Sequence, residues 1–321
     1  MRDFPEFLGA MAVKELRQGV RGKMFVVPFL GVHVAMLLAL GFDFALDEYR
    51  GRGLTGLFFA TVFGSVGPQM AFWHIAYVLL LIVMPWAGLS SLSREREGGN
   101  GELILMAGLS RWKVVIGKWM VLCALGMLTA VTMLPYLLVR YFMGGVNVPF
   151  TIALAIALIM LNATANAMAI GISSYPGIVM RIVIGCVAGL GCYFCAAIVC
   201  ISTAYLGSSV FGIDSALAVV SGGLVGLSAT CFLYGAFGLQ LGRLRIRPYE
   251  RPFEPANSSG LVALMIISPL ILGFTAAITA GFGATIGALL LAWAVVVMEP
   301  NHAQRRAFSS RPPDWERNDA P

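Results

Sequence analysis

The sequence predicts an all-α polytopic membrane protein with both termini in the cytoplasm, and three observations support this. Hydrophobic residues make up 59% of the 321 residues and charged residues only 12%, whereas soluble domains carry about 25% charged residues. Apolar runs of about 20 residues, long enough to span a bilayer as helices, recur along the chain. Lys and Arg collect in alternate segments between these runs, as they do in cytoplasmic loops.

Residues 1–23 precede the first apolar run and carry charges throughout. Because Lys14, Arg17 and Arg21 recur at spacings of three and four, a helix would place them on one face. Leu16 and Val20 would lie on another face of the same helix. This pattern is typical of a basic amphipathic helix at the inner membrane interface, in contact with membrane lipids. Ordinary positive flanking of the first span is the alternative.

Six apolar runs within residues 24–241 are each long enough for one crossing. They cover residues 24–42, 70–92, 114–139, 150–172, 179–206 and 214–241. A basic linker at 242–259 leads to a longer apolar stretch at 260–298, which glycines around Gly281 divide into a two-helix hairpin. With the polar tail at 299–321, the prediction is a chain of about eight spans.

The positions of Lys and Arg predict the orientation. With the N-terminus inside, 19 of the 22 basic residues fall in the cytoplasm, and only Arg50, Arg52 and Arg140 fall outside. The opposite orientation would invert that ratio. The expected location is the cell (inner or plasma) membrane. Because the net charge of +6 lies at the ends of apolar runs, nucleic acid is not an expected partner.

The loop at residues 93–118, between the second and third spans, is the least generic part of the chain. A charged cluster that includes Glu97 is followed by glycines and by a short apolar helix from Glu102. A second helix, capped by Ser110, is predicted to run from Arg111 into the third span. The apolar residues after Glu102 are too few to cross a membrane. They either dock on a partner surface or pack against the chain's own helices. Pro85, shortly before the loop, predicts a kink in the second span.

Motifs in two segments resemble those of one family. The order Glu-Arg-Glu, glycine, Glu-Leu-x-Leu, Leu-Ser-Arg-Trp and Gly-Lys in the loop resembles the cytoplasmic coupling loop of ABC type-2 permeases, the membrane subunits of many ATP-driven exporters. Lys14-Glu15-Leu16-Arg17 with Arg21 resembles the interfacial (elbow) helix of that family. The chain departs from the family pattern at Asn100-Gly101 and Gly108, and the hairpin at 260–298 lies beyond the usual six-span core.

The resemblance implies a permease subunit of an ABC transporter, an exporter rather than an importer. It also implies a second permease subunit, identical or not, and separate cytoplasmic P-loop ATPases that bind ATP and Mg. In the family the loop docks on the ATPase and transmits its closure to the spans. By position, the residues of this docking contact would be Glu97, Glu102, Leu103, Leu105, Met106, Arg111 and Lys113. The substrate path stays unassigned, and lipids, drugs, glycans and peptides remain open as cargo.

Other chemistry is missing from the sequence. No G-x-x-x-x-G-K-[ST] motif occurs, so the chain is predicted not to be an enzyme and to need ATP bound in trans. The six cysteines all lie in apolar runs and are interpreted as packing residues. The three scattered histidines predict no metal site, and no cofactor is expected on this chain.

Polar and small residues within the spans suggest how the helices pack. Asn162 and Asn166, one turn apart, share a face of the fourth span; helix packing is the favoured interpretation, and lining of a translocation path is the alternative. Three Gly-x-x-x-Gly pairs predict close helix approach, at Gly185 and Gly189, Gly222 and Gly226, and Gly283 and Gly287.

Two other functional classes remain open. An ion-coupled secondary transporter would need intramembrane acids or bases, which the predicted spans nearly lack. A non-transporting membrane anchor or assembly subunit would use the same fold to recruit a soluble partner.

Overall fold

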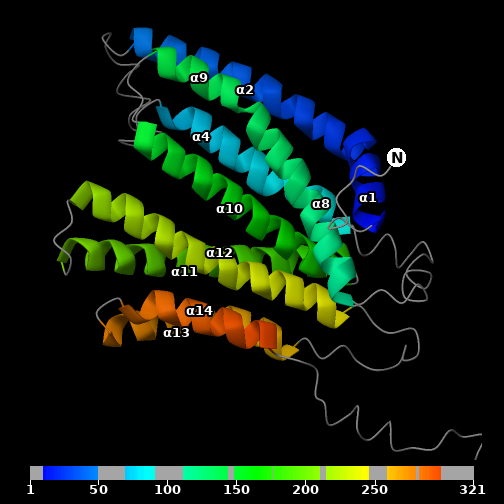
Figure 1. Cartoon of the computed structure of the whole chain (residues 1–321), viewed down its shortest axis with the longest axis vertical. Coiled ribbons are helices and arrows are strands. Elements are labelled where there is room, and N and C mark those ends of the chain that lie inside the picture. The colour runs from blue at the N-terminus through cyan, green and yellow to red at the C-terminus, as the bar shows by residue number, and fades with distance from the viewer. Residues whose placement is uncertain are drawn as a thin grey trace, which may run out of the picture.

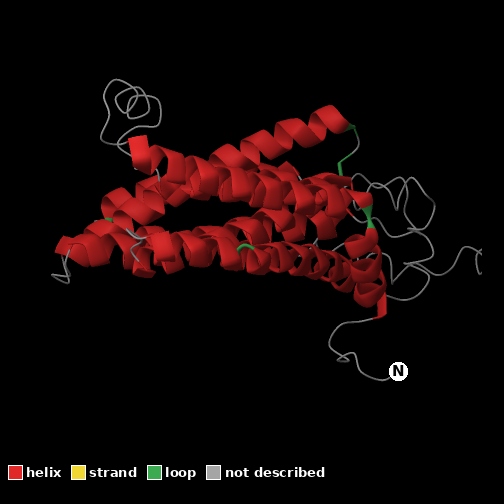
Figure 2. Cartoon of the chain, turned by 90° about the horizontal axis from the view of Figure 1, so that it is seen from above, coloured by secondary structure: helices red, strands yellow, loops and turns green. Residues whose placement is uncertain are grey.

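The computed structural model describes residues 10–49, 69–90, 111–143, 148–175, 177–209, 215–245, 259–279 and 282–297. Within these ranges the chain is almost entirely helical and contains no strand. Most of the helices run along a common direction and lie side by side as a bundle (Figure 2). The prediction of an all-α, multi-pass membrane protein is confirmed at this level.

The first half of the chain forms one side of the bundle (Figure 1). Its helices are α1 (Ala10–Arg21), α2 (Lys23–Tyr49), α4 (Gln69–Val78), the π-helix η1 (Leu79–Val83), α5 (Met84–Trp86), the 3-10 helix η2 (Ala87–Ser90), α8 (Arg111–Thr132) and α9 (Leu134–Met143). The second half consists of α10 (Val148–Ser173), α11 (Ile178–Ser209), α12 (Ser215–Arg245), α13 (Ser259–Ile278) and α14 (Phe282–Val297).

Five helical segments are long and apolar enough to cross a membrane: Trp112–Phe142, Val148–Ser173, Ile178–Thr203, Val220–Arg245 and Ser259–Ile278. Three shorter apolar helices are Phe25–Gly41, Ile75–Trp86 and Gly283–Val297. All eight segments overlap the predicted apolar runs. The number that cross, and the side on which each terminus lies, stay predictions.

Local proline chemistry divides two of the predicted spans. The third is interrupted at Met133, between α8 and α9, because Pro135 cannot donate to a carbonyl in the preceding turn. As the second residue of α9, it occupies a position where a missing N–H is tolerated. The second span, in which Pro85 predicts a kink, passes from α-helix in α4 to π-helix in η1, returns to α-helix in α5 and ends as 3-10 helix in η2.

The outer surface of the bundle is apolar. Large side chains such as Phe142, Leu270 and Leu38 are more than two-thirds exposed. Exposed apolar side chains occur on all the long helices, as expected where hydrocarbon and not water surrounds the protein.

Two large hydrophobic clusters and a small third one, at Val115 and Ile170, form the interior of the described structure. One joins α2, α4, η1, α8 and α9 to the first half of α10, and the other joins the end of α10 to α11, α12, α13 and α14. Between them α10 and α12 meet at backbone distance, because a Cβ at Gly238 would come within 2.5 Å of the Ala167 carbonyl oxygen. The glycine therefore permits this crossing.

The glycine pairs predicted from the sequence differ in their surroundings. Gly226 packs on α11, where an added Cβ would lie 2.9 Å from the Cys200 backbone, and the Gly222 carbonyl accepts a bond of 2.6 Å from the Thr203 hydroxyl. At Gly189 an added Cβ would meet nothing within 4 Å. The pattern at 222–226 therefore makes an internal helix contact, whereas Gly189 faces outward.

The α13–α14 hairpin is joined to the bundle by a buried polar cluster. The Tyr234 hydroxyl lies 3.1 Å from the Ser268 hydroxyl, and Cys195 Sγ lies 3.6 Å from the former and 3.7 Å from the latter. The three residues come from α12, α13 and α11. Hydrogen bonds between helices are the means by which polar side chains stabilise helix association in lipid.

Candidate functional site

The docking residues predicted in the loop lie mainly outside the described residues: Glu97, Glu102, Leu103, Leu105 and Met106. The backbone of Lys14 and Glu15 belongs to α1 and that of Arg111 begins α8, but the positions of these three side chains are not described. Arg17, Arg21 and Lys113 are described and exposed. The chain is helical in both segments where the sequence predicts helices, as α1 and as α8 after Ser110.

Helix α1 packs against α8. Leu16 is half-buried against the hydrophobic cluster that α2, α4 and α8 form. A Cβ at Gly19 would lie 3.1 Å from Leu125 Cδ1 on α8. After Arg21 the chain turns at Gly22 and continues as α2. Helix α1 therefore lies at one end of the bundle and at an angle to α2 (Figure 1). Part of the apolar face of α1 therefore contacts protein, while Arg17 and Arg21 remain exposed.

Arginine contacts join several segments of the chain at one end of the bundle. The Arg243 guanidinium lies 5.0 Å from the centre of the Trp112 ring, and that of Arg245 lies 3.5 Å from the centre of the Tyr175 ring. Arg181 Nε donates to the Tyr175 carbonyl at 2.9 Å, and its Nη1 donates to the Leu89 carbonyl at 3.5 Å. These contacts join the end of α12, the α10–α11 turn, η2 and the start of α8.

This basic end is where the segment between Ser90 and Arg111 leaves and re-enters the described structure. Leu89 contacts Arg181, and Trp112 contacts Arg243. At the far end of the bundle Arg140, which the sequence places outside, lies 5.0 Å from the centre of the Phe72 ring and is 7% exposed. The structure thus separates Arg140 from the cations predicted to be cytoplasmic.

A second polar site lies inside the bundle and starts from Pro85. In the π-helix η1 the Met84 N–H bonds to the Leu79 carbonyl, five residues earlier. The same register would pair the Leu80 carbonyl with residue 85, but proline has no N–H. Asn162 of α10 supplies the missing donor, with Nδ2 2.6 Å from the Leu80 oxygen.

Asn166 fixes the orientation of the Asn162 amide. Its Nδ2 donates to Asn162 Oδ1 at 3.0 Å, and because a carbonyl can only accept, Asn162 must direct its nitrogen towards Leu80. Both asparagines are buried. The predicted packing role of this pair is supported. Asn162 bonds to the Leu80 carbonyl, which Pro85 leaves without a backbone donor. In the sequence, only the position of Pro85 indicates this partner.

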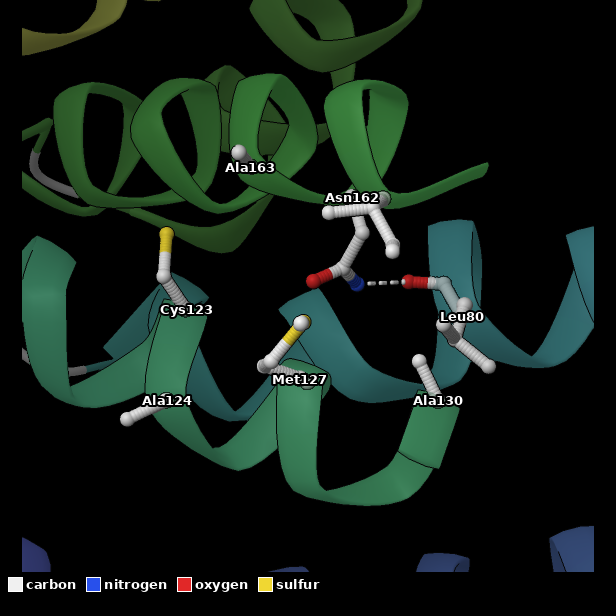
Figure 3. A pocket seen from close by; sticks show the side chains of 9 residues that line it. Leu80, Cys123, Ala124, Met127, Ala130, Asn162 and Ala163 are labelled. Carbon is white, nitrogen blue, oxygen red and sulfur yellow. Dashed lines mark hydrogen bonds between the residues drawn. The ribbon is translucent and has the colours of Figure 1, made fainter. Parts of the chain in front are cut away.

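A cavity of about 300 Å³ lies beside this amide, between α8 and α10 (Figure 3). It is lined by Leu80, Cys123, Ala124, Gly126, Met127, Ala130, Ile159, Asn162 and Ala163. The space depends on Gly126, where any side chain would collide with Asn162 Oδ1.

No reactive cluster accompanies these sites in the described residues. There the six cysteines are all free, and no group of three His, Cys, Asp or Glu side chains could hold a metal ion.

Fold and sites together define an all-α, multi-pass membrane protein with a basic, aromatic-lined end and, among the described residues, polar sites inside the bundle at Asn162 and at Tyr234. Comparison with known proteins adds no relative, because no family model, no curated protein and no solved structure matches the chain.

Proposed function

We propose that the chain is the membrane permease subunit of an ATP-driven ABC transporter, acting as an exporter. The observation that carries the proposal is that Leu89 and Trp112, on either side of residues 91–110, which include most of the predicted coupling loop, both contact arginines at the basic end of the bundle. An interfacial helix packed on α8, as in α1, supports the same assignment through the resemblance of both segments to type-2 permeases.

The helices on either side of the loop suggest how force would be transmitted. Helix α8 runs without a break for 22 residues from Arg111, a length of about 33 Å at 1.5 Å per residue. On the other side η2 is tied to α11 through the Leu89 carbonyl and Arg181. An ATPase that pushed on the loop would move α8 as a rigid rod, and η2 together with α11.

The partners follow from the proposal. Cytoplasmic P-loop ATPases would bind ATP and Mg and would contact the loop through an apolar surface of Leu103, Leu105 and Met106 with a charged rim. A second permease subunit would complete the translocation path. An amphipathic cargo suits a chain whose described interior is mostly apolar.

The described helices favour this proposal over ion coupling. From residue 69 onward no described residue is acidic. Ion-coupled carriers use intramembrane acids or bases to bind and release the coupling ion. The described part of the chain has no carboxylate for that purpose beyond α2.

The proposal is tested by replacing the apolar surface of the loop. Leu105→Glu combined with Met106→Glu should abolish co-purification of a P-loop ATPase while leaving membrane insertion intact, because two carboxylates cannot enter an apolar groove unpaired. Ser93→Glu with Asn100→Glu adds the same charge to the same loop and should retain the ATPase.

Two results would count against the proposal. ATPase binding that survives the Leu105 and Met106 substitutions would contradict the docking assignment. Wild-type protein that brings down no ATPase from its native membrane would favour the non-transporting anchor.

A further inference from the structure

The cavity between α8 and α10 has the features of a small ligand site. Its volume of about 300 Å³ is at the lower end of the range of about 300–1,000 Å³ for small-molecule pockets. The side chains that line it are apolar except for the Cys123 thiol and the Asn162 amide. Such pockets combine an apolar lining with a few placed polar groups that orient the ligand.

The position of the opening indicates where a ligand would come from. Met127 and Ile159 line the cavity and are 47% and 37% exposed, so the cavity opens on the outer surface of the bundle. In a membrane that surface faces lipid chains. A ligand would enter sideways from the bilayer, and it must therefore partition into hydrocarbon.

The inner wall offers both a donor and an acceptor. Asn162 uses one N–H on the Leu80 carbonyl and accepts at Oδ1 from Asn166, which leaves its second N–H for another partner. Leu80 also lines the cavity, and its carbonyl has a second lone pair. A hydroxyl group can satisfy both at once, since it accepts from the amide and donates to the carbonyl.

The volume limits the size of the ligand. At about 30 Å³ for each water-sized group, the cavity holds about ten such groups. A double-chained lipid is too large for this space, whereas a single aliphatic chain of medium length fits it.

We propose that this cavity binds a single-chain aliphatic alcohol from the bilayer, with its hydroxyl at Asn162 and Leu80 and its chain directed towards Met127 and Ile159. In the cavity the hydroxyl gains hydrogen bonds that lipid chains cannot offer. The Asn162 amide and the Leu80 carbonyl each gain a further hydrogen-bond partner. The proposal concerns binding alone and holds whether or not the chain acts as a permease.

The test uses the full-length protein in phosphatidylcholine vesicles. Two photoreactive probes are compared, a decanol and a decane that each carry a diazirine at the same carbon. Crosslinks are located by peptide mass spectrometry. The decanol should label Met127, Ala130 or Ile159 about fivefold more than the decane, the factor expected from one net hydrogen bond. Unlabelled decanol should compete for these sites.

Variants separate cavity binding from general lipid contact. Ala130→Leu fills the space and should reduce cavity labelling to the level of the lipid-facing residue Leu290, which is 61% exposed. Ala263→Leu makes the same change at an exposed position on α13 and should leave labelling unchanged. If Ala130→Leu does not fold, Met127→Trp narrows the opening from an exposed position and should have the same effect.

The outcomes that would overturn the proposal are specific. Equal labelling by decanol and decane would mean that the polar wall recognises no hydroxyl. Cavity labelling that persists in the filled or narrowed variant would mean that the probe crosslinks from the lipid phase.

Discussion

One missing N–H explains a buried polar contact between two elements of this bundle. Pro85 leaves the Leu80 carbonyl without its donor in the π register, and Asn162 reaches it from α10 at 2.6 Å. A buried carbonyl without a partner is costly in a protein interior and more so in lipid. Asn162 therefore has a stabilising role before any role in ligand binding is considered.

A double-mutant cycle measures this dependence. Asn162→Ala should lower the free energy of unfolding by about 1–3 kcal/mol, because the Leu80 carbonyl becomes a buried acceptor without a donor. In a Pro85→Ala background the restored N–H can bond within the helix, so the loss on removing Asn162 should be smaller by about 1 kcal/mol. Denaturant titration in mixed micelles measures all four variants. Strictly additive losses would show that Pro85 and Asn162 are not coupled.

The sequence predicts part of this residue-scale picture. Asn162 and Asn166 are recognisable as a polar pair on one face. The π-helix is not predictable from proline alone, since Pro28 and Pro269 also lie inside helices that stay α-helical. The Leu80 carbonyl in this π-helix bonds to Asn162 of α10, a contact across a helix interface that the local sequence does not contain.

At the scale of elements, α10 and α12 cross with their backbones in contact. Gly238 touches the Ala167 backbone, and Gly242 lies near Val115 and Ile170. Gly238 and Gly242 form a Gly-x-x-x-Gly pair like those predicted from the sequence. The spacing predicts helix faces formed by small residues, but it does not predict which of these faces contact another helix. It therefore does not distinguish Gly238, which meets α10, from Gly189, which faces outward.

Alanine substitutions on α12 test the crossing. Gly238→Ala should destabilise the fold by about 1–3 kcal/mol, because its Cβ must displace the α10 backbone. Gly235→Ala, on the same helix, meets nothing within 4 Å and should be neutral or stabilising by up to about 1 kcal/mol through helix propensity. Thermal unfolding in detergent compares the two variants. Equal effects would mean that α10 and α12 do not meet at Gly238.

At the scale of the whole molecule, charge gathers at one end of the bundle. Arg181, Arg243 and Arg245 lie with Lys113 near the segments that flank the predicted coupling loop, while Arg140 lies at the other end. Apolar runs and charge asymmetry predicted the helical segments and this separation because both depend on the bilayer as solvent. The loop's contacts with a partner depend on a second chain, and no pattern in this chain alone can supply them.

Cysteine labelling from each side of the membrane tests the orientation. Lys113→Cys should react with a membrane-impermeant maleimide only in inside-out vesicles, and Phe142→Cys, exposed at the opposite end, only in right-side-out vesicles. Wild-type protein is the control, since its cysteines lie in apolar helices. Labelling of both variants from the same side, or from the reversed sides, would refute the predicted orientation.

The cluster of Cys195, Tyr234 and Ser268 also bears on how the protein is made. Helices α11 and α12 are synthesised before α13. The Tyr234 hydroxyl therefore has no bond to Ser268 until the final hairpin enters the membrane. During that interval a tyrosine hydroxyl and a thiol share a site that lipid cannot hydrate. We expect membrane quality-control proteins to distinguish the unfinished bundle from the completed one by these exposed polar groups. Insertion of the last hairpin would cover them.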